Sequence, residues 1–110
     1  MKTLPLDNDW EYDYTVTRKI AATGATEAAT GLTGLTGRIS ATDGGATINA
    51  ALTVDLTERG TLGKYYGVVE GDDLREQLAA YIGKPVWEVF GDGTNVLTSV
   101  PRIVRATRRL

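Results

Sequence analysis

Trp10-Glu11-Tyr12-Asp13-Tyr14-Thr15-Val16-Thr17 is the stretch of sequence that decides the fold. Aromatic or aliphatic residues occupy its even positions, and charged or hydroxyl residues occupy its odd positions. This period of two is typical of a β-strand that buries one face and leaves the other in water. The stretch therefore predicts an amphipathic strand in a β protein.

A second alternating stretch covers 35–42 and runs into Asp43-Gly44-Gly45. Glycine supplies the positive φ that a tight turn requires, so a hairpin is expected here. Its return strand is predicted over 48–57, where Ile48, Leu52 and Val54 share one face. The segment 21–37 is rich in Thr, Ala and Gly, and it predicts an irregular loop that enters a strand near Leu35.

The second half of the chain adds three strands and one helix. Residues 64–69 predict a strand, and 86–90 with 96–106 predict a closing hairpin. Asp73 and Glu76 have the spacing of a capping box, and Gly83 followed by Pro85 is a stop signal. The helix is therefore expected over about 73–82.

These elements predict a mainly β domain, because strands and helices do not alternate as a parallel sheet requires. We expect a single antiparallel β-sandwich over 1–110, which can include an extended N-terminal segment over 1–9. One short helix, 73–82, connects its strands. The predicted core consists of Trp10, Tyr12, Tyr14, Ile39, Leu52, Val54, Tyr66, Val68, Leu78, Trp87, Val89 and Val104.

The composition is that of an ordinary globular domain, with 42% hydrophobic and 24% charged residues. The apolar runs are too short for a membrane span, and 1–7 lacks the apolar region of a secretory signal. The absence of cysteine agrees with synthesis and retention in a cytoplasm. A net charge of −2 argues against general attraction to nucleic acid or to anionic lipid.

Charge is distributed unevenly between the two ends of the chain. Four acids crowd the beginning and four arginines crowd the end: Asp7, Asp9, Glu11, Asp13, Arg102, Arg105, Arg108 and Arg109. One interpretation is two solvated edges, or two neighbouring strands that neutralise each other. The other is a complementary pair of interaction surfaces that join one subunit to the next.

The side chains of the common catalytic systems are missing. The chain has neither His nor Cys, which removes the usual nucleophile systems and the Cys/His zinc sites. The glycines fit no phosphate-binding motif, and Asp92-Gly93-Thr94-Asn95 is better explained as a turn than as a metal loop. We therefore assign no catalytic, cofactor-binding or metal-binding residue, and we expect a protein that is not an enzyme.

Several short features together resemble the small immunoglobulin-like domains of tailed-phage virions. They are Leu32-Thr33-Gly34-Leu35-Thr36-Gly37, Asp43-Gly44-Gly45, Gly63-Lys64-Tyr65-Tyr66-Gly67, Asp72-Asp73-Leu74 and Lys84-Pro85-Val86-Trp87. The family is that of the N-terminal domain of baseplate upper proteins and related tail or head accessory proteins. The resemblance implies an immunoglobulin-like sandwich in the virion, with other virion proteins and further copies of the chain as partners and no cofactor.

The sequence thus favours three alternative functions, in decreasing order of preference. The first is a non-catalytic structural protein of a virion, made in the host cytoplasm and acting in several copies. The second is a carbohydrate- or ligand-binding module that exposes some of its aromatic residues, which are Tyr12, Tyr65, Tyr66, Tyr81 and Trp87. The third is an enzyme that uses carboxylates alone, which needs two acids to converge in one cleft.

Overall fold

The computed structural model describes residues 2–6, 8–60, 63–92 and 95–106. Within these residues the chain is mainly β, as the sequence predicts, and it has one short α-helix. The elements are β1 (Thr3–Pro5), β2 (Trp10–Thr15), β3 (Thr17–Lys19), β4 (Thr26–Ala28), β5 (Thr36–Ser40), a 3-10 helix (Ala50–Leu52), β6 (Val54–Asp55), β7 (Thr57–Glu58), β8 (Lys64–Val69), α1 (Gly71–Leu78), a 3-10 helix (Ala79–Tyr81), β9 (Pro85–Gly91) and β10 (Val96–Arg105).

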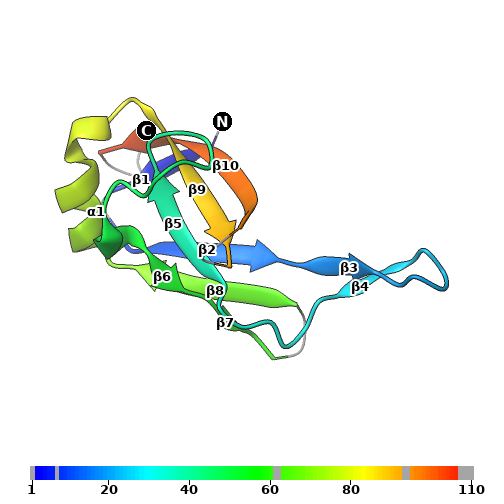
Figure 1. Cartoon of the computed structure of the whole chain (residues 1–110). Coiled ribbons are helices and arrows are strands. Elements are labelled where there is room, and N and C mark those ends of the chain that lie inside the picture. Colours follow the sequence, from blue (N-terminus) through cyan, green and yellow to red (C-terminus); the bar gives the residue numbers. More distant parts are fainter. Residues whose placement is uncertain (1, 7, 61–62, 93–94, 107–110) are drawn as a thin grey trace.

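The strands form two layers, as in a sandwich. A five-stranded sheet has the order β1-β10-β9-β5-β6, and a three-stranded sheet has the order β2-β8-β7. Adjacent strands are antiparallel except β1 and β10, which run parallel. Figure 1 shows α1 at one end of the layers and a third, two-stranded sheet of β3 and β4 projecting from the other end.

The core lies between the two layers and beneath α1. Its buried members are Leu4, Leu6, Tyr12, Leu35, Ile39, Leu52, Leu56, Tyr65, Val69, Leu74, Leu78, Val86, Phe90 and Val104. The predicted strand 10–17 is confirmed as β2, and Tyr12 at its centre is fully buried. The Tyr12 hydroxyl donates a hydrogen bond of 2.7 Å to the Leu52 carbonyl. Trp10 and Tyr14 are partly buried against the same core.

The prediction of which face of β8 is buried was wrong. Tyr66 and Val68 were expected inside, but Val68 is 45% exposed while Tyr65 and Val69 are buried. A Cβ on Gly67 would lie 2.7 Å from Val54 Cγ1, so glycine lets this face of β8 pack closely. Because side chains alternate along a strand, an error of one residue turns the whole face over.

The predicted return strand over 48–57 was also wrong for most of its length. Residues Ala50–Leu52 form a 3-10 helix, whose start is capped by the Asn49 side chain accepting from the Ala51 N–H at 2.9 Å. Asparagine competes in this way with strand pairing. What remains of the strand is β6 in one sheet and β7 in the other.

The helix begins two residues before its predicted start and ends as a 3-10 turn at Tyr81. The predicted capping box does not form, because the N-cap residue is Glu70 and its side chain makes no capping hydrogen bond. Leu74 and Leu78 are fully buried, as the helical spacing requires. The closing hairpin is confirmed as β9 and β10, although Trp87, expected in the core, is only half-buried.

Replacing Tyr12 by Phe removes only the buried hydroxyl and leaves the Leu52 carbonyl without its partner. We expect the free energy of unfolding to fall by about 1–2 kcal/mol, measured by urea denaturation. Tyr66→Phe is the matched control, since this ring stacks against Arg59 and the contact survives the loss of the hydroxyl. Equal losses in the two variants would contradict the structural role assigned to the Tyr12 hydroxyl.

Candidate interaction surface

Strands β2 and β3 form one continuous strand from Trp10 to Lys19. Between them, the Val16 N–H donates to the Gly63 carbonyl at 2.9 Å, and the Val16 carbonyl accepts from the Ala29 N–H at 2.9 Å. The N–H and carbonyl of one residue in a strand point to the same side. The two successive partners, β8 and then β4, therefore lie on the same side of this long strand.

The opposite side of the long strand is open. The backbone N–H and carbonyl of Val16 point to the paired side of the strand. Because these groups alternate in direction along a strand, those of the odd-numbered residues point to the opposite side. None of them forms a backbone hydrogen bond on that side with any other described residue. We call this set the open edge, and it consists of Glu11, Asp13, Thr15, Thr17 and Lys19. All five are exposed.

The second part of the surface is a projecting arm, 17–28, made of β3, β4 and their turn (Figure 1). The sequence predicted an irregular loop after residue 20, and this was wrong for β4. The Ile20 N–H donates to the Ala25 carbonyl at 2.7 Å, and Gly24 adopts a φ of 73°. These bonds close a turn, which brings 26–28 back along β3 as a strand.

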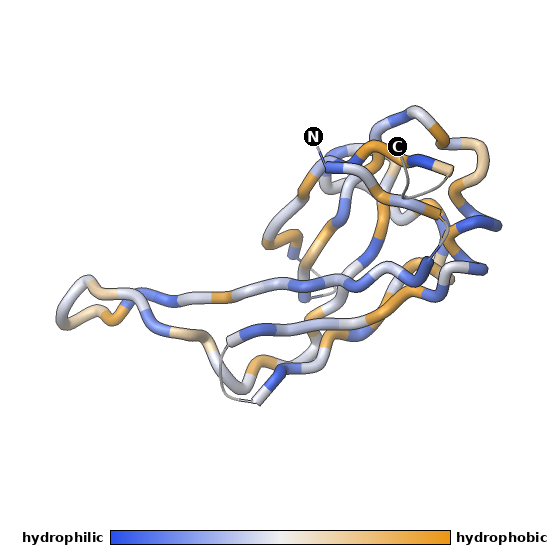
Figure 2. Tube along the Cα trace, turned by 180° about the vertical axis from the view of Figure 1, so that it is seen from behind, coloured by the Kyte–Doolittle hydropathy of each residue, from blue (hydrophilic) through white to orange (hydrophobic). Residues whose placement is uncertain are grey.

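The arm is exposed almost throughout, since apart from Ile20 and Ala28 its residues are open to solvent. Figure 2 shows polar residues along its stem and more apolar ones at its turn. Arg18 and Glu27 form a cross-strand ion pair of 2.9 Å, but their side chains are 58% and 45% exposed. An exposed pair contributes at most about 1 kcal/mol, so the pair holds the arm weakly.

The predicted acidic residues are divided between two places. Glu11 and Asp13 lie on the open edge, where Glu11 forms an ion pair of 3.0 Å with Arg59. Asp9 lies before the edge and turns towards α1, where its Oδ1 accepts from the Gly71 N–H at 2.7 Å. Asp7 lies outside the described residues.

The predicted basic residues lie elsewhere, on β10. This strand is flanked by β9 and, over its last three residues, by β1, so its end offers no open edge. Arg102 turns inward to an ion pair of 2.9 Å with Glu88, while Arg105 is exposed. Arg108 and Arg109 lie outside the described residues. The cation of the open edge is instead Lys19, which no charge pattern of the sequence had singled out.

Glu88 is the most unusual ionisable group of the described part of the chain, with a side chain only 4% exposed. Its carboxylate accepts from the Trp10 indole N–H and pairs with Arg102, whose buried Nε has no hydrogen-bond partner. Burial raises the pKa of Glu88 above its ordinary value of 4.5, although Arg102 and the Trp10 hydrogen bond oppose the shift. Burial also raises the pKa of Tyr12, and the charge of Glu88 adds to that effect. This cluster joins β2 to the five-stranded sheet.

A surface pocket of about 380 Å³ lies over the outer face of β5 and β9 and is lined by Thr36, Arg38, Ala46, Thr47, Thr53, Val89, Gly91, Asn95 and Val96. Its cation, Arg38, is already bound to the Gly45 carbonyl and to Thr47. The pocket therefore presents mostly apolar surface together with neutral polar groups.

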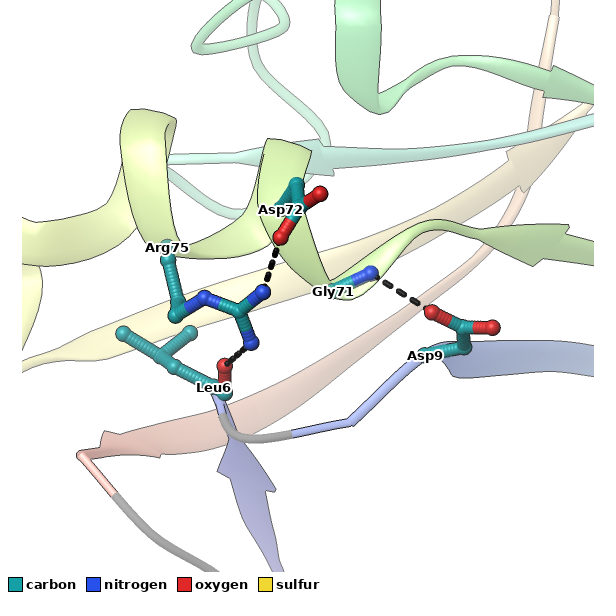
Figure 3. Close-up of polar contacts among 5 residues, drawn as sticks. All are labelled: Leu6, Asp9, Gly71, Asp72 and Arg75. Atoms are coloured by element: carbon teal, nitrogen blue, oxygen red, sulfur yellow. Dashed lines mark hydrogen bonds and ion pairs between the residues drawn. The ribbon is translucent and has the colours of Figure 1, made fainter.

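A second pocket, of about 300 Å³, lies at the start of α1 and is lined by Asn8, Asp9, Glu70, Gly71, Asp72 and Arg75. Three of its four charged side chains, Asp9, Asp72 and Arg75, are engaged with the protein itself, as Figure 3 shows. Arg75 binds the Leu6 carbonyl at 3.0 Å and also pairs with Asp72, while Asp9 holds the helix N-terminus. Asp9 and Asp72 therefore have a structural role, because their contacts attach the start of α1 to the N-terminal segment.

The aromatic residues expected in a sugar-binding platform are scattered. Tyr12 and Tyr65 are fully buried, while Tyr66 and Trp87 are half-buried on strands of different sheets. Within the described ranges, no three metal-ligating side chains gather into a cluster. No described helix is long and apolar enough to cross a membrane.

Comparison of the chain with protein-family models, with curated proteins and with solved structures finds no match.

Replacing one partner of the buried Glu88–Arg102 ion pair should lower the free energy of unfolding more than replacing both partners. We expect Glu88→Gln to lower the free energy of unfolding by about 3 kcal/mol at neutral pH, because Arg102 is left buried without a counter-ion. Glu88→Gln combined with Arg102→Met should recover most of this loss in urea denaturation. If the double variant were as unstable as the sum of the single ones, the two side chains would not act as a pair.

The comparison of the wild type with the double variant also predicts how the free energy of unfolding depends on pH. The pKa of Glu88 is higher in the folded state than in the unfolded state. Its contribution to stability is therefore fully present below the unfolded pKa and is lost as pH rises through the folded pKa. The stability of the wild type relative to the double variant should therefore fall as pH rises above about 4.5.

Asp9→Ala should expose the N-terminus of α1, because Asp9 is the side chain that binds the Gly71 N–H. We expect a loss of about 1 kcal/mol in the free energy of unfolding, typical of a lost helix cap. Glu76→Ala, an exposed substitution in the middle of the same helix, is the control and should change stability by less than about 0.5 kcal/mol. A larger effect at Glu76 would argue against the anchor.

Proposed function

We propose that this protein is a non-catalytic structural component of a multi-copy assembly, which it joins through the arm 17–28 and the open edge. The observation that carries the proposal is the arm. It projects from the body of the protein and contributes no residue to the buried core (Figure 1). Its strands pair with each other and with no other strand in the described part of the chain.

The energetics of the arm favour a docking role. A two-stranded hairpin alone is only marginally stable in water, because ordering its backbone costs about 1–2 kcal/mol per residue. The body of this protein does not offset that cost, since residues 17–27 are exposed apart from the half-buried Ile20. A partner that covered the arm would offset it by burying side chains and pairing the free strand edges.

The proposed assembly is the virion of a tailed phage. The Gly63-Lys64-Tyr65-Tyr66-Gly67 strand entry and the Lys84-Pro85-Val86-Trp87 hairpin support this choice, because they resemble domains of tail and head accessory proteins. The protein would be made in the host cytoplasm and act in several copies beside other virion proteins.

Removing the arm tests this function. We expect replacement of 18–27 by Asn-Gly to leave the urea unfolding midpoint of the body nearly unchanged, since the arm supplies no core residue. Incorporation of the chain into purified virions, measured by immunoblot, should drop at least tenfold. Glu76→Ala on the exposed side of α1 is the control and should be incorporated normally. Absence of the wild-type chain from virions would overturn the proposal.

A further inference from the structure

We infer that the open edge pairs antiparallel with the open edge of a second copy of this chain, about a two-fold axis at Thr15. This inference deepens the proposed function and rests on it, because it names the partner that covers the arm. It stands on three features of the edge: its hydrogen-bonding pattern, its charges and its length.

The hydrogen-bonding pattern is self-complementary. Antiparallel strands exchange two hydrogen bonds between each facing pair of residues whose backbone groups point at one another. With Thr15 opposite Thr15 of the second copy, Asp13 faces Thr17 and Glu11 faces Lys19. All five residues of the open edge then find partners, and 10–19 contains no proline that would remove a donor.

The charges select this arrangement over the alternatives. Glu11 and Asp13 lie in one half of the open edge, and Lys19 lies in the other half. In the antiparallel pair Lys19 lies directly opposite Glu11 and diagonal to Asp13, both favourable contacts. A parallel pair in register would instead place each charge beside its own copy, which is unfavourable. Charges on an edge normally discourage pairing, but here their order suits a second copy.

Two of these charges are available for the contact. Among the described residues, Asp13 and Lys19 form no ion pair, whereas Glu11 and Arg18 already have exposed partners. The second copy would thus supply an opposite charge to each of these two side chains. The pairing gains charge contacts without breaking any buried interaction.

The length of the edge explains the arm. Ten extended residues span about 33 Å, longer than the body strand β2 alone. In the proposed pair, β3 of each copy lies along β2 of the other, so each arm is supported by the partner's body. The exposed hairpin then becomes part of a continuous sheet that contains β8 and β2 of one copy and β3 and β4 of the other.

Cysteine cross-linking tests the register. The chain has no cysteine, so Thr15→Cys can form a disulfide only between copies. Facing residues of a hydrogen-bonded antiparallel pair lie about 5.5 Å apart at Cα, within disulfide range. We expect covalent dimers of Thr15→Cys under mild oxidation at high protein concentration. Thr57→Cys, exposed on β7, is the control and should remain monomeric. Equal cross-linking of both variants would overturn the register.

Charge reversal tests the pairing itself. Glu11→Lys alone and Lys19→Glu alone each place like charges at both symmetric contacts, so each should weaken the homodimer about tenfold in sedimentation velocity. Mixing the two variants restores opposite charges at both contacts, and the mixture should dimerise as well as the wild type. A mixture that associates no better than its components would overturn the inference.

The two proposals can fail separately. If the chain is present in virions but Thr15→Cys gives no cross-link there or in solution, the edge pairing is wrong and the structural role stands. If the cross-link and the charge rescue are observed but the chain is absent from virions, the pairing stands and the virion role is wrong.

Discussion

The structure depends on one constraint, which is that the strand from Trp10 to Lys19 pairs along only one of its two edges with the other described residues. Its even-numbered backbone groups bond first to β8 and then to β4. The even side chains over β2 face the core, with Tyr12 fully buried and tied to Leu52. The same alternation leaves every odd residue exposed, so the buried face and the open edge have a common origin.

The polar groups of the interior hold this strand in place. Trp10 reaches Glu88 across the two layers, and Asp9 anchors the start of α1. Because Glu88 is buried, its ion pair with Arg102 links β9 and β10 at a cost in desolvation. The charged residues of the open edge lie at the surface instead, with Glu11 and Asp13 in one half and Lys19 in the other.

Resemblance, arm and open edge support the same proposal by different routes. Short sequence features resemble virion domains, whereas the arm is a feature of the tertiary structure that no sequence pattern indicated. An arm that its own body does not support gains stability when a partner covers it, and in the proposed pair a second copy would supply both backbone groups and charges.

The sequence by itself determined the mainly β class, the strand at Trp10, the closing hairpin and the burial of Leu74 and Leu78 on the helix, because these follow from local period and turn chemistry. Only the tertiary structure decided which face of β8 is buried, since Gly67 packs against Val54 from another sheet. It likewise decided that Asp9 rather than Asp73 accepts a hydrogen bond at the start of α1. It also decided that Arg102 forms a buried ion pair with Glu88 instead of lying on the surface. Each of these depends on a contact between residues distant in the chain, and local periodicity carries no information about such contacts.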